Sequence, residues 1–534
     1  MSHLLITPVL LPAITGALII LWMRADLLLQ RVFSIAGTAL LLAVAVHLNL
    51  VAASGEVQVY RLGNWAAPFG IVLMLDRLSA LMVALAAGLG LVVQLYALGS
   101  GWDRKGWHFH ALWQFQLMGL CGAFLTGDAF NLFVFFEVLL IASYGLMIHG
   151  GGPMRLRAGV QYIAYNLAGS TLFLAALGVL YAVTGTLNMA DMAVRVAALP
   201  AADTALLRAG AVLLMLVFAI KAALVPLHFW LPSTYANAPG PVAALFAILS
   251  KVGVYAILRF FTLVFPRDPV TGSVVAGLLV PAALFSVALG QAGILGTRHL
   301  GRMAGFATIA SVGTLVVAAA QFTPQGSAAA IYYLIHSTLA GAAMFLVVDL
   351  IGARQGHAWI RPLGAIPQAG LIAGMFMLAA IAVAGLPPLS GFTGKLLVLG
   401  ATGRTPAAPW IWGTILLFSL VAIYGLARAG AVLFWTPAPA PVPAGGAEAA
   451  SPAGSGDTGG AIPPRLEPDE PIQDLGDAAS PALAAVAVGA LLAATLALSL
   501  LAGPVLRLGE AVARQIHDPA PYLRAVLTMQ EGTK

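Results

Sequence analysis

The chain has 534 residues, of which 60% are hydrophobic and only 9% are charged. Soluble domains carry about 25% charged residues, so this composition excludes an ordinary soluble protein and places most of the chain in lipid. A single cysteine, Cys121, excludes a disulfide framework and a cysteine-based metal or iron–sulfur site within one chain. The net charge of +6 comes without a basic run or a nucleic-acid motif, so the few charges are better interpreted as topology signals than as a sign of an anionic partner.

Apolar windows long enough to cross a bilayer recur along the whole chain, since a transmembrane helix needs about 20 apolar residues. The first window has no positive n-region and no small-residue cleavage site, which predicts a retained helix rather than a signal peptide. The sequence predicts an all-α membrane protein with about fourteen spans, at 4–22, 28–50, 70–98, 109–127, 129–148, 160–184, 205–225, 240–265, 273–295, 303–320, 327–350, 368–400, 409–435 and 480–503.

The distribution of lysine and arginine predicts the orientation, because loops on the inner side carry an excess of these residues. An even number of spans puts both termini on one side. With the N-terminus outside, the inner loops hold Arg24, Arg31, Arg104, Lys105, Arg155, Arg157, Arg298, Arg302, Arg354 and Arg361. The outer loops then hold Arg61, Arg195, Arg208, Arg267 and Arg404. Ten basic residues in the inner loops against five in the outer loops favour an orientation with both termini on the outer side.

One long polar segment interrupts the apolar pattern, from Thr436 to Ser480. It is rich in Pro, Ala and Gly and holds seven acidic residues and one base, Arg465. Such a composition cannot bury a core and predicts a disordered loop without a role in conduction.

Two of the predicted spans contain helix breakers beside a lysine. In "KAALVPLHFWLP", Pro226 and Pro232 follow Lys221, and in "AGLPPLSGFTGK", paired prolines and two glycines precede Lys395. Non-helical backbone at membrane depth is tolerated only where it is buried in protein or lines a cavity. Two broken helices at corresponding places in two halves indicate an inverted-repeat transporter.

Six ionisable residues lie inside apolar stretches: Asp76, Glu137, Lys221, Lys251, His336 and Lys395. Four of them have a simpler alternative. Asp76 precedes Arg77, so a local pair near a helix end is as good an interpretation. A packing role is the alternative for His336, and snorkelling to the surface is the alternative for the two lysines Lys221 and Lys251.

The helix that carries Glu137 offers no base, so a partner for that acid has to come from another helix. A charged residue near the bilayer centre costs ~2.5–3.5 kcal/mol on insertion scales, and such residues are kept where they pair or serve an ion path. Burial favours the neutral form of a lysine, a nearby carboxylate opposes that effect, and histidine titrates near neutral pH. One acid, three lysines and one histidine at this depth therefore predict a proton channel.

Two rival motifs fail. "GFTGKL" lacks the spacing of a phosphate loop, since Leu389 and Leu396 occupy the deciding positions. His108 and His110 have no third ligand nearby, which argues against a metal site, and no cofactor is expected.

The segments "FNLFVFFEVLLIASYGLMIHGG", "KAALVPLHFWLPSTYANAPGPVAALFAILSKVGVYAILR" and "AGLPPLSGFTGKLLVLG" resemble the antiporter-like subunit family. That family includes the proton-pumping membrane subunits of respiratory complex I and the large subunits of Mrp-type cation/proton antiporters. The resemblance covers roughly residues 70 to 435 and is greater to the D subunits of Mrp-type (Pha-type) Na+(K+)/H+ antiporters than to complex I. The much longer A subunits do not fit, and the loop at 436–480 has no clear place in the family pattern.

The resemblance implies a role for each of five residues. Glu137 matches the acid of the fifth helix, and Lys221 matches the lysine of the broken seventh helix that pairs with it. Lys251 matches the eighth-helix relay lysine, His336 the eleventh-helix relay position, and Lys395 the terminal lysine of the broken twelfth helix.

The resemblance also implies two inverted five-helix repeats, each with a broken helix. The expected parts are helices 1–3 at 1–106, a first repeat of helices 4–8 at 107–265, a second repeat of helices 9–13 at 266–435, the acidic loop at 436–480, and a last helix and tail at 481–534.

Two functions stay open at this point. The favoured one is a non-enzymatic, proton-translocating subunit of a multisubunit Na+ or K+/proton antiporter in the bacterial inner membrane, with other antiporter subunits as partners. The alternative is the proton channel of a complex I-like or membrane-bound hydrogenase assembly, whose redox centre would lie in another subunit because this chain shows no haem, flavin or iron–sulfur ligand set.

Overall fold

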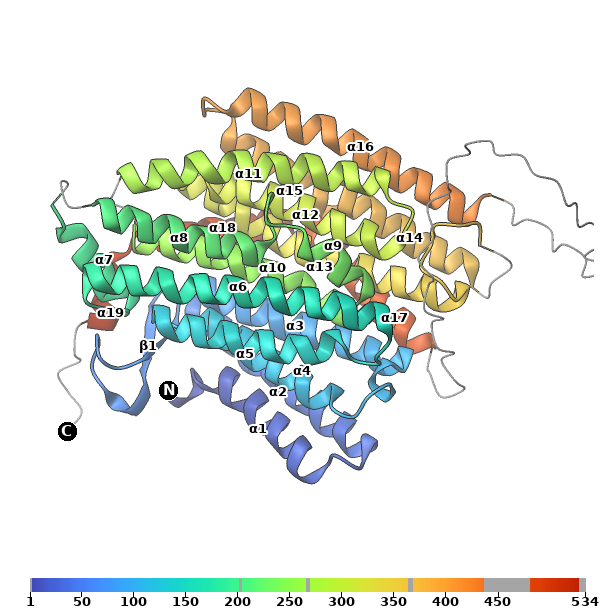
Figure 1. Ribbon diagram of the computed structural model, residues 1–534, viewed down its shortest axis with the longest axis horizontal. Helices are drawn as coiled ribbons and strands as arrows, with labels where there is room; N and C mark the ends of the chain where they lie inside the picture. Colours follow the sequence, from blue (N-terminus) through green and yellow to red (C-terminus); the bar gives the residue numbers. More distant parts are fainter. Residues whose placement is uncertain (1, 201–203, 266–268, 364–367, 437–480, 528–534) are drawn as a thin grey trace, which may run out of the picture.

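The computed structural model describes residues 2–200, 204–265, 269–363, 368–436 and 481–527 as a bundle of long helices. Most of these helices run side by side along the horizontal axis of Figure 1. The helices of the first half are α1 (Thr7–Trp22), α2 (Leu27–Ala52), α3 (Arg77–Ser100), α4 (Phe109–Leu125), α5 (Ala129–Met147), α6 (Pro153–Thr184), α7 (Met189–Ala198), α8 (Ala205–Ala222), α9 (Trp230–Asn237) and α10 (Gly240–Leu263). The helices of the second half are α11 (Pro269–Gly296), α12 (Leu300–Ala319), α13 (Pro324–Gln355), α14 (Ala369–Ala384), α15 (Ser390–Thr402), α16 (Ala408–Phe434), α17 (Pro481–Leu500), α18 (Ala502–His517) and α19 (Ala520–Leu527).

Each of the fourteen predicted windows falls on a helix, and the window at 368–400 falls on the two halves of a broken one, α14 and α15. Among the described helices, eleven are long and apolar enough to cross a membrane, and α1 and α14 are shorter apolar helices. The helical membrane fold is therefore confirmed, whereas the number of spans stays a prediction.

Short polar side chains set where several helices begin. Asp26 accepts a hydrogen bond from the backbone N–H of Leu29, and Asp128 accepts one from Asn131. Each acid lies just before its helix and satisfies a backbone donor that has no partner within the helix. Because these caps are encoded locally, the starts of α2 and α5 follow directly from the sequence.

The window predicted at 70–98 is wrong at its beginning. Strand β1 (Gln58–Arg61) pairs antiparallel with β2 (Val72–Leu75), and α3 begins only after Asp76, which forms a capping box with Ser79. All four residues of β2 are apolar and buried. A short apolar run of this kind cannot be told from helix by its periodicity, which explains the error.

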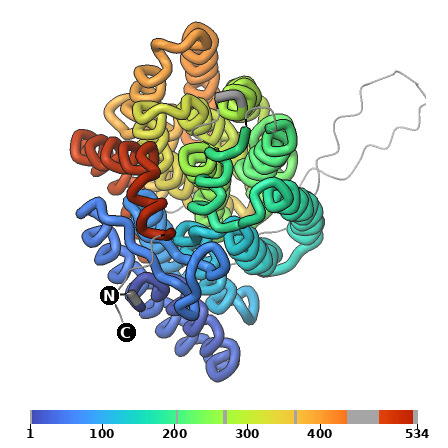
Figure 2. The backbone as a smooth tube through the Cα atoms, turned by 90° about the vertical axis from the view of Figure 1, so that its left-hand side faces the viewer, coloured from blue at the N-terminus to red at the C-terminus, as the bar shows by residue number. Residues whose placement is uncertain are grey.

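Helix α10 is the centre of the bundle, since every residue from Gly240 to Leu263 is buried. It packs against α3, α8, α12 and α13. In Figures 1 and 2, α1–α6 (blue to teal) form one side of the molecule and α11–α16 (yellow-green to orange) form the other. A central helix without an exposed residue has no contact with lipid, so a charge placed on it is enclosed by protein.

The C-terminal helices α18 and α19 were not predicted. Helix α18 buries Gly509, Val512, Ala513 and Ile516 on one side, and it packs against α13, α10 and α3. Helix α19 lies beside β1 and α7, at the end of the bundle that carries the β1–β2 hairpin. The first helix begins at this same end, since the short helix η1 (Ser2–Leu4) also contacts β1 (Figure 1).

Candidate functional site

The first break separates α8 from α9, and Lys221 lies in the last turn before it. Ala223, with φ of 56°, ends α8, and the indole N–H of Trp230 donates to the carbonyl of Ile220 at 3.1 Å. The side chain of Lys221 is buried, and its Nζ donates to the carbonyl and the side-chain oxygen of Asn166 at 3.3 and 3.4 Å and to Ser170 Oγ at 3.3 Å. The lysine therefore points toward α6 and does not snorkel to the surface.

Glu137 is half-buried on α5, and its Oε1 is buried without a hydrogen-bond partner among the described residues. None of the ion pairs found in the described ranges joins it to Lys221, whose Nζ lies 5.9 Å from the ring centre of the neighbouring Phe136. Glu137 still acts on Lys221 electrostatically. The expected Glu–Lys pair is thus a charge interaction over some distance, with polar groups of α6 as the direct ligands of the ammonium.

Lys251 lies in the middle of α10 and is 1% exposed, which rules out snorkelling. Two residues further, Gly253 abuts the backbone of α8: an added Cβ would lie 2.9 Å from the backbone nitrogen of Ala222. This close approach brings the part of α10 that carries Lys251 against the part of α8 that carries Lys221.

His336 is buried on α13, and its Nδ1 lies 2.9 Å from Ser390 Oγ, the first residue of α15. Its ring packs edge-on against Tyr333, and it interacts electrostatically with Lys395 and Lys251. A packing contact and a place between two lysines are therefore both present.

Lys395 lies on α15 just after the second break and is 7% exposed. Its Nζ donates to the carbonyl of Ala384, the last residue of α14, and to Ser419 Oγ on α16, both at 2.7 Å. Carbonyls at a helix C-terminus have no partner within the helix and favour a cation. Gly385, with φ of +77°, leaves room for the lysine, since a Cβ there would lie 2.8 Å from Lys395 Cδ.

The structure thus places Lys221, Lys251, His336 and Lys395 in one buried series, which runs from α8 through α10 and α13 to α15. Glu137 lies at the edge of this series, on the outer side of α5. The serines and Asn166 that hold the ammonium groups were missed, because hydroxyl and amide side chains are common in helices and carry no signal of their own.

The local pair of Asp76 with Arg77, given above as an equally good alternative, is wrong. Asp76 forms a buried ion pair with Arg259 of α10, with Arg259 Nη2 and Asp76 Oδ1 2.9 Å apart. Arg77 instead donates to the backbone carbonyl of Ala53. The partner of Asp76 lies 183 residues away in the sequence, so spacing along the chain gave no sign of it.

His110 was weighed as a metal ligand and instead joins a buried ion cluster. Its Nε2 lies 3.3 Å from Asp103 Oδ2, and Arg31 binds both oxygens of the same carboxylate. Burial raises the pKa of Asp103, but the hydrogen bonds from His110 and Arg31 outweigh it, and the net shift of the pKa is downward. Within the part of the chain that the structure describes, no three His, Cys, Asp or Glu side chains are grouped to hold a metal ion.

Residues 126–428, which include all five predicted site residues, match the family described as NADH:quinone oxidoreductase/Mrp antiporter, TM. A protein of Rhizobium meliloti, named as the probable D subunit of a K(+)/H(+) antiporter, is 41% identical over 471 residues, covering 82% of this chain and 87% of that protein. The D subunit of a Na(+)/H(+) antiporter of Bacillus subtilis is 39% identical over 438 residues, with the same coverage of each chain.

Two solved structures show the same arrangement of helices. A chain of the Mrp complex from Dietzia sp. DQ12-45-1b superposes with a TM-score of 0.83 at 29% identity, over 99% of each chain. A chain of respiratory complex I from Thermus thermophilus superposes with a TM-score of 0.74 at 25% identity, over 96% of this chain and 99% of that one.

Proposed function

This chain belongs to the membrane-subunit family shared by NADH:quinone oxidoreductases and Mrp antiporters, and we propose that it carries protons as the D-type subunit of a multisubunit Na+ or K+/proton antiporter. The observation that carries the proposal is the buried series Lys221, Lys251, His336 and Lys395, with Glu137 at its edge. The antiporter function is favoured over the respiratory one because the relatives at 39–41% identity are antiporter subunits, whereas the complex I chain is 25% identical.

Each residue of the series has a defined part in the proposal. Desolvation favours the neutral form of a lysine and a nearby carboxylate favours the charged form. A change in the distance between Glu137 and Lys221 therefore changes how readily Lys221 releases its proton. Lys251 and His336 pass protons through the centre of the bundle, and Lys395 delivers them at the second break, where freed carbonyls and Ser419 replace water around the ammonium.

The chain is a multi-pass membrane protein that works with other antiporter subunits. The bacterial inner membrane is its proposed location, with both termini outside. In support, η1 and α19 lie at the same end of the bundle, and the opposite end carries the larger number of basic loop residues. The boundaries between the two repeats, near residues 107, 266 and 435, remain part of this proposal.

The test replaces Glu137 and Lys221 in the intact complex, one at a time, with alanine. Cation-driven proton movement is measured in inverted vesicles and normalised to the amount of assembled complex. Each variant is expected to abolish exchange without loss of assembly. Glu56→Ala, which removes an exposed acid between α2 and β1, is the control and is expected to exchange normally. Normal exchange by an assembled Glu137→Ala or Lys221→Ala complex would contradict the proposal.

A further inference from the structure

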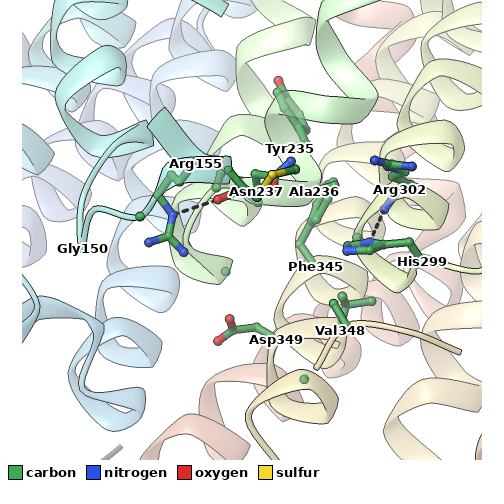
Figure 3. Close-up of a pocket in the computed structure, with 18 of the residues that line it drawn as sticks. Gly150, Arg155, Tyr235, Ala236, Asn237, His299, Arg302, Phe345, Val348 and Asp349 are labelled. Carbon is green, nitrogen blue, oxygen red and sulfur yellow. Dashed lines mark hydrogen bonds between the residues drawn. The ribbon is translucent and has the colours of Figure 1, made fainter. Parts of the chain in front are cut away.

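A cavity of about 500 Å³ lies at the end of the bundle opposite the β1–β2 hairpin. Its walls come from both halves of the chain: Arg155 at the start of α6 and Gly240 at the start of α10 belong to the first half, and Arg302 of α12 and Asp349 of α13 to the second. Figure 3 shows Arg155 on the left, His299 and Arg302 across from it on the right, and Asp349 below and between them. The five residues of the proposed relay do not line this cavity.

Asp349 is the one acidic residue among the described residues that line the cavity. Its Oδ2 accepts hydrogen bonds from the hydroxyl of Tyr96 at 2.7 Å and from the indole N–H of Trp102 at 3.0 Å. The carboxyl group lies directly over the first residue of α10, because a Cβ added to Gly240 would overlap its Cγ and would force a shift. Asp349 is therefore held at the end of the α10–α13 interface that borders the cavity.

The contact between α10 and α13 leads from Asp349 to Lys251. Gly240 and Lys251 are eleven residues apart, which is three helical turns on one face and about 16 Å at ~1.5 Å per residue. Midway, an added Cβ on Gly341 of α13 would lie 3.7 Å from Ala247 Cβ. At the far end, His336 of α13 interacts electrostatically with Lys251. The two helices therefore run past each other with Asp349 at the open end, Gly341 and Ala247 in the middle, and the relay residues at the closed end.

A second row of residues on α10 also leads from the cavity toward Lys251. Ala243 lines the cavity, and Ser250 lies seven residues further, on the same face. Ser250 is fully buried, and its hydroxyl has no hydrogen-bond partner among the described residues. Buried polar groups of this kind are satisfied by ordered water, so an unpartnered hydroxyl next to Lys251 is a natural position for a water molecule that serves the relay.

The remaining charges on the cavity wall are positive. Lys105, Arg155 and Arg302 line it together with Asp349, and both Lys105 and Arg155 interact electrostatically with that acid, while Arg354 acts on its partner Tyr96. Three bases against one acid repel a hydrated metal ion. A single carboxylate whose oxygens already receive two hydrogen bonds also supplies too few ligands for one.

We propose that this cavity is the proton vestibule of the chain, in which Asp349 takes up protons for Lys251 while Lys105, Arg155 and Arg302 keep Na+ and K+ out. The proposal rests on the relay described above. In the step itself, a hydronium ion gives its proton to a carboxylate oxygen of Asp349. The O–H bond then breaks as water in the α10–α13 contact carries the proton inward, and an N–H bond forms on the neutral amine of Lys251.

The first test compares Asp349→Asn with Asp349→Glu in the assembled complex. Proton transfer by a positioned acid or base contributes about 10²–10⁴-fold to a rate, so Asp349→Asn is expected to lower cation-driven proton flux about a hundredfold, whereas Asp349→Glu keeps most of the flux. Asp191→Asn, which removes an acid from the exposed pair with Arg195, is the matched control. Normal flux in assembled Asp349→Asn complex overturns the assignment.

A milder variant covers the case in which Asp349→Asn does not assemble. Tyr96→Phe keeps the aromatic packing and removes one donor to the carboxylate, so it is expected to change the pH dependence of proton flux. An unchanged pH profile in assembled Tyr96→Phe complex argues for a structural role of Asp349 and overturns the proposal.

The second test concerns the exclusion of metal ions. A cleft lined with one sign of charge changes local ion concentrations by roughly 10–10³-fold. The double variant Lys105→Gln/Arg302→Gln is therefore expected to make proton flux about tenfold more sensitive to inhibition by NaCl or KCl. Choline chloride is the salt control. Each salt is added in turn to either side of the vesicle membrane. Arg208→Gln/Arg404→Gln removes two charges at the other end and is expected to change nothing. Equal salt sensitivity of the two double variants would overturn the proposal that the basic residues keep Na+ and K+ out of the cavity.

Lys221→Ala in the same vesicles separates the two proposals. If the Lys221→Ala complex shows no proton flux and the Asp349→Asn complex shows normal flux, the vestibule proposal is wrong and the relay proposal is supported. If both exchange normally, the relay itself is wrong.

Discussion

At the scale of single residues, the ammonium of Lys395 is held by an uncharged helix end rather than by an acid. Its two ligands, the carbonyl of Ala384 and the hydroxyl of Ser419, accept hydrogen bonds equally from lysine and arginine. The two side chains differ in chemistry, since lysine can lose its proton when buried and arginine stays charged at any working pH.

Lys395→Arg is therefore expected to keep the charge and to block turnover. The measurement is cation-driven proton flux in inverted vesicles per amount of intact complex. Arg404→Lys, an exchange of the same two residue types at an exposed position beyond α15, is the control and is expected to be silent. Wild-type flux in the Lys395→Arg complex would leave Lys395 as an electrostatic anchor without a protonation role.

His299 gives the chain a sensitivity to acid outside the membrane spans. It precedes α12, and its Nδ1 accepts a hydrogen bond from the backbone N–H of Arg302 at 3.3 Å. Burial, with a smaller effect of the Arg302 charge, lowers the pKa of His299 from 6.5 to about 4. In the unfolded chain this histidine binds a proton as the pH falls below about 6.5, whereas in the folded chain it stays neutral down to about pH 4.

The stability that neutral His299 contributes is thus present above pH 6.5 and is lost as the pH falls toward 4. The melting temperature of the purified complex is expected to drop between pH 7 and pH 4.5, and His299→Asn is expected to reduce that drop, because asparagine caps the helix and does not titrate. His47→Asn, at an exposed position on α2, serves as the control. An identical drop with and without His299 would show that other groups dominate the acid response.

The residues that could be predicted from the sequence share one property: each is a lone charge in a long apolar run. Glu137, Lys251 and Lys395 stand out in this way without any knowledge of their partners. Asp349 lies only a few residues before Arg354 in the last turn of α13, so it resembles an ordinary charge at a helix end. Its place in a cavity depends on α10 and α6, which the sequence alone does not bring together.

At the scale of elements, the ion pair of Asp76 and Arg259 ties the start of α3 to α10. Asp76 also caps α3 through the backbone N–H of Ser79 at 2.8 Å. Tyr522 of α19 covers the pair, with its ring 5.6 Å from the guanidinium of Arg259. Because both charges are buried, loss of one partner leaves the other uncompensated.

Asp76→Asn keeps a capping side chain and removes the charge, so it is expected to destabilise the protein by ~3–5 kcal/mol, as typical for a broken buried pair. The double variant Asp76→Asn/Arg259→Met is expected to recover much of the loss, since no buried charge remains. Thermal unfolding of the purified complex measures both. Asp191→Asn breaks an exposed pair worth about 0.3–0.5 kcal/mol and provides the reference; an Asp76→Asn variant as stable as that one would contradict the argument.

The two broken helices show why composition predicts some elements and misses others. Prolines close to a lysine, together with glycines in the second case, mark each break within one short segment, so both breaks were found from local sequence. The β1–β2 hairpin and α18 depend instead on what they pack against. A four-residue apolar strand such as Val72–Leu75 and an amphipathic helix at the surface have no signal that separates them from a span or a polar tail.

Across the bundle, the two halves meet along α10 and α13, the helices that carry Lys251 and His336. Each half contributes a broken helix with a lysine, but the lysines lie on opposite sides of their breaks: Lys221 before the first and Lys395 after the second. The series therefore runs across the bundle from one half to the other rather than along any single helix, which is the geometry that lateral transfer of protons requires.

The packing of α18 and α19 against the start of α3 and the β1–β2 hairpin has a consequence for how the chain is made. Gln515 of α18 binds the backbone of Arg77 and Gly55, and Arg61 reaches the carbonyl oxygens of Ala525 and Val526 of α19, more than 430 residues later in the sequence. Synthesis proceeds from the N-terminus, so the helices that carry the charges enter the membrane before the segment that covers Asp76 and Arg259 exists. This end of the bundle therefore closes only after α18 and α19 have been synthesised.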